Sequence, residues 1–296
     1  MNRGIVLFGI NTERVDYIQL AVMCAGFIKK NMPGTQICLL TDQNSIDYHN
    51  GKNMWQLCDY FAHVKLVPQE KEKFENLRAY RDTQYYSFTT KFKNENRASV
   101  YDLSPFDETL LIDSDYLICN DVLSSVWGSA EQVMINNQAV GLMHNQMHDN
   151  EIWLNAYGIR MYWATAVYFK KSDKAKLLFD LVEHIKDNWV YYKLTYDFPG
   201  NLFRNDFAFS IAIHILSGFI DQGNFVAPLP DDTILTATDR DQFYKIKSAK
   251  ELVFFANDAK ETWKFYASKT KALNVHCMNK LSLLNNTDKI MEALNA

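Results

Sequence analysis

The sequence predicts an α/β fold in which a mixed, mostly parallel central sheet is flanked by helices. Two observations carry this prediction. Apolar runs of strand length alternate along the chain with segments whose apolar residues recur at helical spacing. Within about the first 40 residues the order is strand, helix, strand, and a connection of that length joins parallel strands. The chain has no Gly-, Ser- or Pro-rich linker, so we expect one domain over residues 1–281, with a C-terminal helix or tail over 282–296.

The N-terminal elements give the clearest pattern. Residues 4–10 form a continuous apolar run, which is typical of a strand buried on both faces. Thr12 is suited to cap a helix whose apolar residues recur over 15–28, and the second strand covers 36–41. Ligands of parallel sheets bind beyond the carboxyl ends of the strands. We therefore expect four residues on the rim of a binding site, namely Asn11, Thr12, Thr41 and Asp42.

Later elements follow at longer intervals. Further strands are expected at residues 109–112, 139–143, 163–170 and 252–256, and helices at 172–187 and 205–216. Ser172 suits the N-cap of the first of these helices, whose leucines and other apolar residues fall on one face.

Composition limits the class of protein. At 48% hydrophobic residues the chain can bury a sizeable core, which excludes a disordered protein, and a net charge of -4 provides no overall basic field for nucleic acid. The charge is uneven, because residues 245–280 carry eight Lys against three acids. The start of the chain has one short apolar run followed at once by charged residues, so we expect no signal peptide there. The longest apolar stretch, 207–220, is shorter than the ~20 residues a membrane span needs. We expect a cytoplasmic protein whose five cysteines are reduced and mostly buried.

The strongest local feature is the apolar strand over 109–112 that runs into Asp113-Ser114-Asp115. Two carboxylates at the carboxyl end of a sheet are accessible to a hard divalent cation and to a diphosphate. Adjacent carboxylates also repel each other unless a cation or an arginine neutralises them. The alternative interpretation is a solvated turn at the end of a strand.

The segment from Asn96 to Ile118 resembles the core of the GT-A nucleotide-diphospho-sugar transferases. In that family an arginine-bearing helix, a turn with proline, an aromatic residue and an acid, and a D-x-D strand end follow in this order. Here they correspond to Arg97, residues 105–107 and residues 113–115. The resemblance extends loosely to about Leu281, and the chain is also similar to uncharacterised glycosyltransferase-like proteins of large tailed phages.

This resemblance implies an enzyme, a metal-dependent hexosyl- or pentosyltransferase. It would move a sugar from a nucleoside diphosphate sugar, with UDP favoured, to a hydroxyl acceptor such as a hydroxymethylated base in phage DNA. A protein or glycan acceptor is an alternative, as is a non-catalytic nucleotide-sugar-binding module. The outcome at the sugar carbon, retaining or inverting, is left open.

The resemblance also implies the metal site. Asp113 and Asp115 align with the D-x-D acids, which hold Mn²⁺ or Mg²⁺ and contact the ribose or sugar, so Asp113 is also a catalytic candidate. His276 stands where related enzymes have a histidine that completes the metal site, and Lys280 where they have a lysine that grips the diphosphate. This chain lacks the glycine, the longer spacing and the Pro-Trp of their motif. The alternative for His276 is a core residue.

Asp206 is the second catalytic candidate, because the resemblance places it beside the donor sugar. It would act as a base toward the acceptor or support an oxocarbenium-like state; from the residues alone, helix capping also explains it. The donor-binding candidates implied by the resemblance are Asn11, Thr12 and Tyr17 for nucleobase and ribose, Arg97 for phosphates, Ser114 within D-x-D, Ala164 and Thr165 for the sugar, and Asn205. The alternatives are core packing for Tyr17 and an exposed helix charge for Arg97.

The aromatic segment 145–162 is a further candidate. It contains Trp153, Tyr157 and Tyr162, which either line the acceptor site or are ordinarily buried. His144 and His148 are spaced like zinc ligands on a helix, but the surrounding Asn and Gln favour a loop, so we expect no metal there.

Overall fold

The computed structural model describes most of the chain. The described residues are 2–52, 55–68, 76–83, 86–142, 153–154, 159–198, 202–220, 224–236, 241–257 and 264–295. Within them, no helix combines the length and the apolar character needed to cross a membrane.

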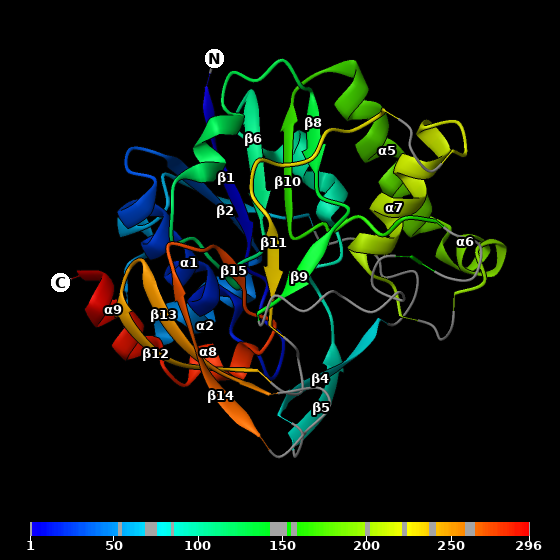
Figure 1. Cartoon of the computed structure of the whole chain (residues 1–296). Helices are drawn as coiled ribbons and strands as arrows, with labels where there is room; N and C mark the ends of the chain where they lie inside the picture. Colours follow the sequence, from blue (N-terminus) through cyan, green and yellow to red (C-terminus); the bar gives the residue numbers. More distant parts are fainter. Residues whose placement is uncertain are drawn as a thin grey trace.

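A six-stranded sheet forms the centre of the molecule (Figure 1). Its strands, in spatial order, are β3 (His63–Leu66), β2 (Gln36–Thr41), β1 (Arg3–Phe8), β6 (Glu108–Ile112), β10 (Ala166–Lys170) and β8 (Val133–Ile135). Strands β3, β2, β1 and β6 pair in parallel, whereas β10 is antiparallel to both of its neighbours. The predicted mixed, mostly parallel sheet flanked by helices is thus confirmed.

Helices pack on both faces of this sheet, because its strands are apolar on both sides. Ile5 and Leu7 of β1 join one core with α1 (Tyr17–Asn31) and α9 (Thr287–Asn295), whereas Val6 and Phe8 join a second core with α5 (Asp173–Asp187) and α7 (Asn205–Leu216). The other helices of the described residues are α2 (Gln43–Gly51), α3 (Val100–Leu103), α6 (Trp189–Thr195), α8 (Lys280–Leu284) and the 3-10 helices Leu57–Asp59, Arg97–Ser99 and Val122–Val126.

Three smaller sheets complete the described part of the fold. A four-stranded sheet has the order β7 (Tyr116–Leu117), β15 (Val275–His276), β11 (Thr233–Leu235) and β9 (Ala139–Gly141). An antiparallel sheet consists of β12 (Gln242–Ser248), β13 (Glu251–Asn257) and β14 (Phe265–Lys271), and β4 (Leu77–Thr83) pairs with β5 (Tyr86–Lys91) in a hairpin. Figure 1 shows the antiparallel sheet beside α9 and the hairpin at the bottom of the view.

Two of the later helices match the sequence prediction closely. Helix α7 covers Asn205–Leu216, as expected, and α5 begins after Ser172, whose hydroxyl accepts a hydrogen bond from the backbone N–H of Ala175. Four of the five cysteines are buried, as expected, and Cys58 is exposed.

The prediction of Thr12 as the cap of the first helix is wrong. Helix α1 begins at Tyr17, and the Asp16 carboxylate caps it by accepting from the Gln19 N–H. The Thr12 hydroxyl instead accepts from the N–H of Val15, at 3.0 Å, and closes the turn before the helix.

One strand prediction is also corrected, and another is confirmed in a separate sheet. The strand expected over 163–170 begins only at Ala166, because the backbone before it bonds elsewhere: the Trp163 N–H donates to the carbonyl of Asn136. The strand expected over 252–256 exists as β13, but it lies outside the central sheet. Its chain neighbours β12 and β14 are strands themselves and pair with it antiparallel, so β13 belongs to their sheet.

Candidate functional site

The two acids of the D-x-D segment lie in the turn between β6 and β7. The Asp113 N–H donates to the carbonyl of Thr165, at 2.8 Å, and the Tyr116 N–H donates back to the carbonyl of Asp113, at 3.1 Å. Strand β7 pairs antiparallel with β15, opposing Tyr116 to His276, and the Cys277 N–H donates to the carbonyl of Asp115. This short pairing brings a histidine 161 residues away beside Asp115.

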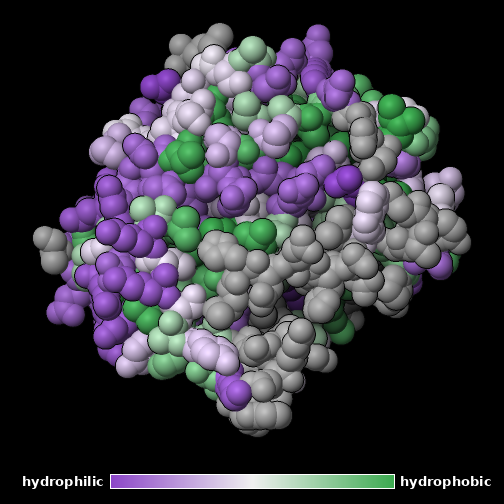
Figure 2. Space-filling model, viewed as in Figure 1, coloured by the Kyte–Doolittle hydropathy of each residue, from purple (hydrophilic) through white to green (hydrophobic). Residues whose placement is uncertain are grey.

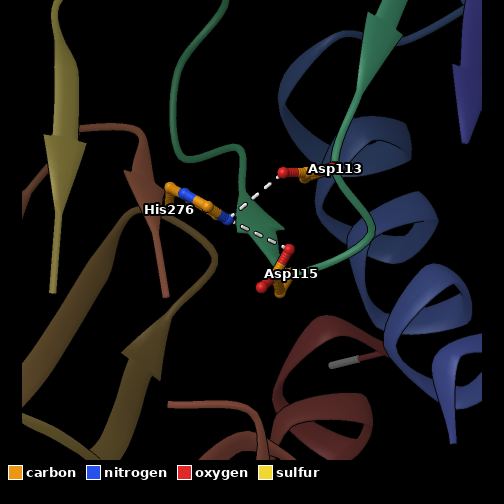
Figure 3. Close-up of side chains that lie close together, drawn as sticks. All are labelled: Asp113, Asp115 and His276. Atoms are coloured by element: carbon orange, nitrogen blue, oxygen red, sulfur yellow. Dashed lines mark hydrogen bonds and ion pairs between the residues drawn. The ribbon is translucent and has the colours of Figure 1, made fainter. Parts of the chain in front are cut away.

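Asp113, Asp115 and His276 form one cluster, with the imidazole directed at both carboxylates (Figure 3). His276 Nε2 lies 3.2 Å from Asp115 Oδ1 and 3.4 Å from Asp113 Oδ2, and one ligand atom from each residue lies within 4.8 Å of the other two. Asp115 and His276 are buried, while the Asp113 side chain is 25% exposed. Two hard oxygen ligands and one borderline nitrogen suit Mn²⁺, and the carboxylates suit Mg²⁺.

Two buried cations contact the acids of this cluster. Lys280 Nζ lies 2.5 Å from Asp115 Oδ2, and the Arg97 guanidinium contacts both Asp113 and the carbonyl oxygen of Ala164. Arg97 is 5% exposed, so the alternative of an exposed helix charge does not describe it.

These contacts set the ionisation of the site. Burial raises the pKa of Asp115, but the charges of Lys280 and His276, and their hydrogen bonds, outweigh burial and hold that pKa well below its ordinary value. Burial lowers the pKa of Arg97 to about 10, against the opposing attraction of Asp206 and Asp115. At neutral pH Asp115 is therefore a carboxylate and Arg97 a cation.

The cluster lies on the wall of an open cavity, whose space together with the solvent at its mouth is about 680 Å³. The cavity is lined by Phe8, Tyr17, Arg78, Phe92, Asn94, Arg97, Asp113, Ser114, Asp115, Trp163, Ala164, Thr165, Phe203, Arg204, Asn205, Asp206, His276, Met278 and Lys280. Most of the residues predicted to bind donor or metal therefore lie around one space, although they come from segments far apart in the sequence.

Asp206 lies on the cavity wall and forms a hydrogen bond with the segment that precedes β10. Its Oδ1 accepts from the Ala164 N–H at 2.9 Å, and its Oδ2 accepts from Arg204 Nη2 at 2.7 Å. It does not cap α7, since the residue at the cap position is Arg204 and no side chain caps that helix end. Burial raises the pKa of Asp206, but Arg204 and the Ala164 N–H outweigh it, so the pKa lies below its ordinary value.

Several lining side chains have buried polar atoms with no hydrogen-bond partner in the described part of the chain. They are Trp163 Nε1, Thr165 Oγ1, Asn205 Oδ1 and His276 Nδ1. A buried donor or acceptor left without a partner costs about 1–3 kcal/mol, so such groups usually serve a ligand or a bound water. Their concentration around this cavity indicates that it takes a polar ligand.

Four predicted rim residues do not line the cavity. The Thr41 hydroxyl donates to the carbonyl of Gly9 at 2.7 Å, and the Asp42 carboxylate caps α2. Asn11 Oδ1 accepts from the Ile18 N–H at 3.0 Å, and Thr12 closes the turn before α1. Their side-chain oxygens thus hold local backbone, and their roles in ligand binding stay predictions.

The candidate residues of segment 145–162 either lie outside the described residues or lie away from the cavity. Tyr157, together with His144 and His148, lies outside the described residues. Of the others, Trp153 lies under the Arg160 guanidinium, 4.8 Å from the ring centroid, and Tyr162 is buried. Neither Trp153 nor Tyr162 lines the cavity.

Two arginines of the cavity were missed from the sequence. Arg78 lies on β4 and places its guanidinium over the rings of Tyr80 and Phe92, 5.4 and 5.3 Å from their centroids. No sequence pattern identified the β4–β5 hairpin that carries it. Arg204 could have been identified from the sequence, because it stands two positions before the predicted Asp206. In the structure it forms an ion pair with that acid.

Neither family models nor curated proteins match this chain. Solved structures similar to it include the galactosyltransferase LgtC in complex with donor and acceptor sugar analogs, with 12% identity over 99% of this chain and 95% of that one and a TM-score of 0.49. GlyE, a glycosyltransferase of Streptococcus pneumoniae, is 12% identical over 77% of this chain, with a TM-score of 0.43; the match spans 45% of the GlyE chain. Mouse xyloside xylosyltransferase 1 is 9% identical over 74% of this chain and 84% of that one, with a TM-score of 0.40. The backbone of this chain is thus distantly similar to the structures of these glycosyltransferases.

Proposed function

We propose that this protein is a metal-dependent glycosyltransferase. It transfers a hexose or pentose from a nucleoside diphosphate sugar, with UDP as the favoured nucleotide, to a hydroxyl group of an acceptor. The observation that carries the proposal is the cluster of Asp113, Asp115 and His276 at the wall of a cavity that also holds buried cations and unpartnered polar atoms.

The cluster is the part of the cavity that fits a divalent cation. Asp113, Asp115 and His276 would hold Mn²⁺ or Mg²⁺, and the bound cation would supply Lewis-acid neutralisation of the diphosphate leaving group. Lys280 lies on the same wall and donates to Asp115, and we assign its ammonium group to the phosphate oxygens as well.

The charges of the cavity suit a diphosphate. Its lining contains four basic side chains, Arg78, Arg97, Arg204 and Lys280, and three carboxylates, Asp113, Asp115 and Asp206. A bound divalent cation would make the cavity clearly positive, and a nucleoside diphosphate would restore the balance. Arginine forks are well matched to phosphate oxygens, so Arg97 and Arg78 are the proposed phosphate contacts beside Lys280.

The uncharged lining suits the rest of a nucleotide sugar. Tyr17 is a buried ring whose hydroxyl lies 2.9 Å from that of Tyr80, and we assign this aromatic wall to the nucleobase. Thr165 and Asn205 carry unpartnered oxygens, and these we assign to hydroxyl groups of the donor sugar or ribose. Ala164, fixed between Arg97 and Asp206, lines the same wall.

Asp206 is the proposed catalytic carboxylate. Because its pKa lies below the ordinary value, it is ionised at neutral pH and is a weak proton acceptor. A fixed negative charge of this kind suits stabilisation of positive charge that develops on the sugar, in either a retaining or an inverting reaction. The Ala164 N–H and Arg204 hold the carboxylate in one orientation.

A screen of nucleoside diphosphate sugars with Mn²⁺ tests this proposal. Release of the nucleoside diphosphate is measured with and without excess chelator, and in the presence of hydroxymethylated DNA, protein or glycan acceptors. We expect release from one donor class, loss of release in chelator, and an increase with the true acceptor. Turnover that persists in chelator contradicts the mechanism, and metal-dependent nucleotide binding without any turnover identifies a non-catalytic module instead.

A further inference from the structure

The antiparallel sheet β12–β13–β14 has one buried and one solvent-facing side. Leu252, Phe254 and Ala256 of β13 are each 0% exposed, and they pack into the core that contains α1 and α9. Since side chains alternate along a strand, the intervening residues of β13 face the other way. Figure 2 shows this side of the molecule, where hydrophilic and hydrophobic side chains are interleaved over the sheet at the lower left.

Aromatic rings stand on the solvent-facing side. Tyr244, Phe255 and Phe265 are 46%, 36% and 47% exposed. The rings of Tyr244 and Phe255 touch across two strands, with centroids 4.3 Å apart. Phe265 pairs with Asn257, two positions along β13 from Phe255, so Phe265 and Phe255 share a face. The rings thus form a platform across all three strands.

Lysines surround this platform. The three strands contain four lysines, Lys245, Lys247, Lys269 and Lys271, and a single acid, Glu251. Glu251 pairs with two of them, at 3.3 Å from Lys247 and 2.8 Å from Lys269. The Lys245 ammonium lies 5.7 Å from the centroid of the Tyr244 ring. We call the surface made by Tyr244, Phe255, Phe265 and these four lysines the basic aromatic face.

We propose that the basic aromatic face binds single-stranded nucleic acid. Its lysines would contact the phosphates, and its exposed rings would stack with unpaired bases, the combination found where proteins hold single strands. The excess of positive charge disfavours a second copy of this face as the occupant, because the two copies would repel. Rings that stand on the surface of a sheet can stack on bases only when those are unpaired, so a duplex fits less well.

This inference concerns a surface outside the donor cavity, since none of its residues lines that cavity. A failed test of the proposed glycosyl transfer would therefore not contradict this inference, and a failed test of this inference would not contradict the proposed glycosyl transfer. It also assigns a role to the lysine-rich segment 245–280, whose positive charge is not apparent from the overall net charge of -4.

Binding of a labelled oligothymidylate to the full chain, followed by fluorescence anisotropy over a series of salt concentrations, tests the proposal. We expect Tyr244→Ala and Phe255→Ala each to weaken binding by about 5- to 150-fold, the usual range for loss of one stacked base. Lys245→Gln should lower the slope of log affinity against log salt by about 0.7, as one lost phosphate contact on a single strand does.

Matched controls separate this face from general effects. Tyr191→Ala and Lys176→Gln remove an exposed ring and an exposed lysine elsewhere, and they should leave binding unchanged. Melting temperature and metal-dependent nucleotide binding should be unchanged in all five variants. Failure of the oligothymidylate to bind at low salt overturns the proposal. The proposal is also overturned if heparin binds as tightly as the oligothymidylate and the aromatic substitutions leave oligothymidylate binding intact. Binding of anionic vesicles instead of the oligonucleotide would overturn it as well.

Discussion

Replacing Asp115 by asparagine is expected to abolish metal-dependent donor turnover and to lower the affinity for Mn²⁺ by more than about 100-fold. Loss of partners that merely orient metal ligands already costs about 10–100-fold, and Asp115 is a proposed ligand itself. It is 2% exposed and its carboxylate lies beside both His276 and Lys280, so it is the buried acid of the cluster.

The same substitution is expected to destabilise the fold. It leaves the Lys280 ammonium buried without its counter-charge, and breaking a buried pair in this way costs about 3–5 kcal/mol. Adding Lys280→Met removes the unpaired charge, and we expect the double variant to recover much of the lost stability but none of the Mn²⁺ binding. Stability is measured by urea unfolding and Mn²⁺ binding by calorimetry.

Asp180 provides the matched control. It pairs with Lys176 on the surface, with side chains 54% and 49% exposed, and such pairs contribute about 0–1 kcal/mol. Asp180→Asn should therefore change neither stability nor Mn²⁺ binding appreciably. An Asp115→Asn protein that folds and still binds Mn²⁺ like the wild type would show that the cation site lies elsewhere.

Replacing Asp206 by asparagine is expected to lower kcat by about 10²–10³-fold while the KM for the donor changes little. The magnitude is that of losing one preorganised electrostatic contact to the transition state. Asparagine retains an oxygen that can accept from the Ala164 N–H, so the wall of the cavity should keep its shape. What the variant loses is the negative charge and the oxygen that accepts from Arg204.

Steady-state kinetics and pH dependence test the role of Asp206. Because its pKa is lowered in the fold, the wild-type carboxylate stays ionised as the pH falls from neutrality, and its protonation should reduce kcat only below the ordinary carboxyl range, ~3.9. Asp206→Asn should remove that acidic loss and leave a low, flat rate. A kcat within a few-fold of wild type would exclude Asp206 from the chemical step, provided that the melting temperature is unchanged.

The sequence predicted the elements whose local signals were strong. Strand β1 is apolar on both faces, and α5 has both a capping serine and a single apolar face, so each was identified from its own residues. The D-x-D turn was located because a buried strand runs directly into it. In these places local pattern and tertiary packing agree.

The parts that were missed depend on contacts between distant segments. Strands β7 and β15 have two residues each, too few for any periodicity, yet their pairing places His276 beside Asp115. Arg78 joins the cavity only through the β4–β5 hairpin, which lacks a clear alternating pattern. The rule that ligands bind at strand ends led to Asp113 and Asp115 after β6, which line the cavity, whereas after β1 and β2 the side chains of Asn11 and Asp42 accept hydrogen bonds from helix backbone.

The most direct test of the central claim is calorimetric titration of the wild-type protein with UDP in the presence of Mn²⁺ and in excess chelator. If Asp113, Asp115 and His276 hold a cation for a nucleoside diphosphate, UDP should bind at least about tenfold more tightly with Mn²⁺, a difference of about 1.4 kcal/mol. Equal UDP affinity in chelator, or no UDP binding in either condition, would contradict the account.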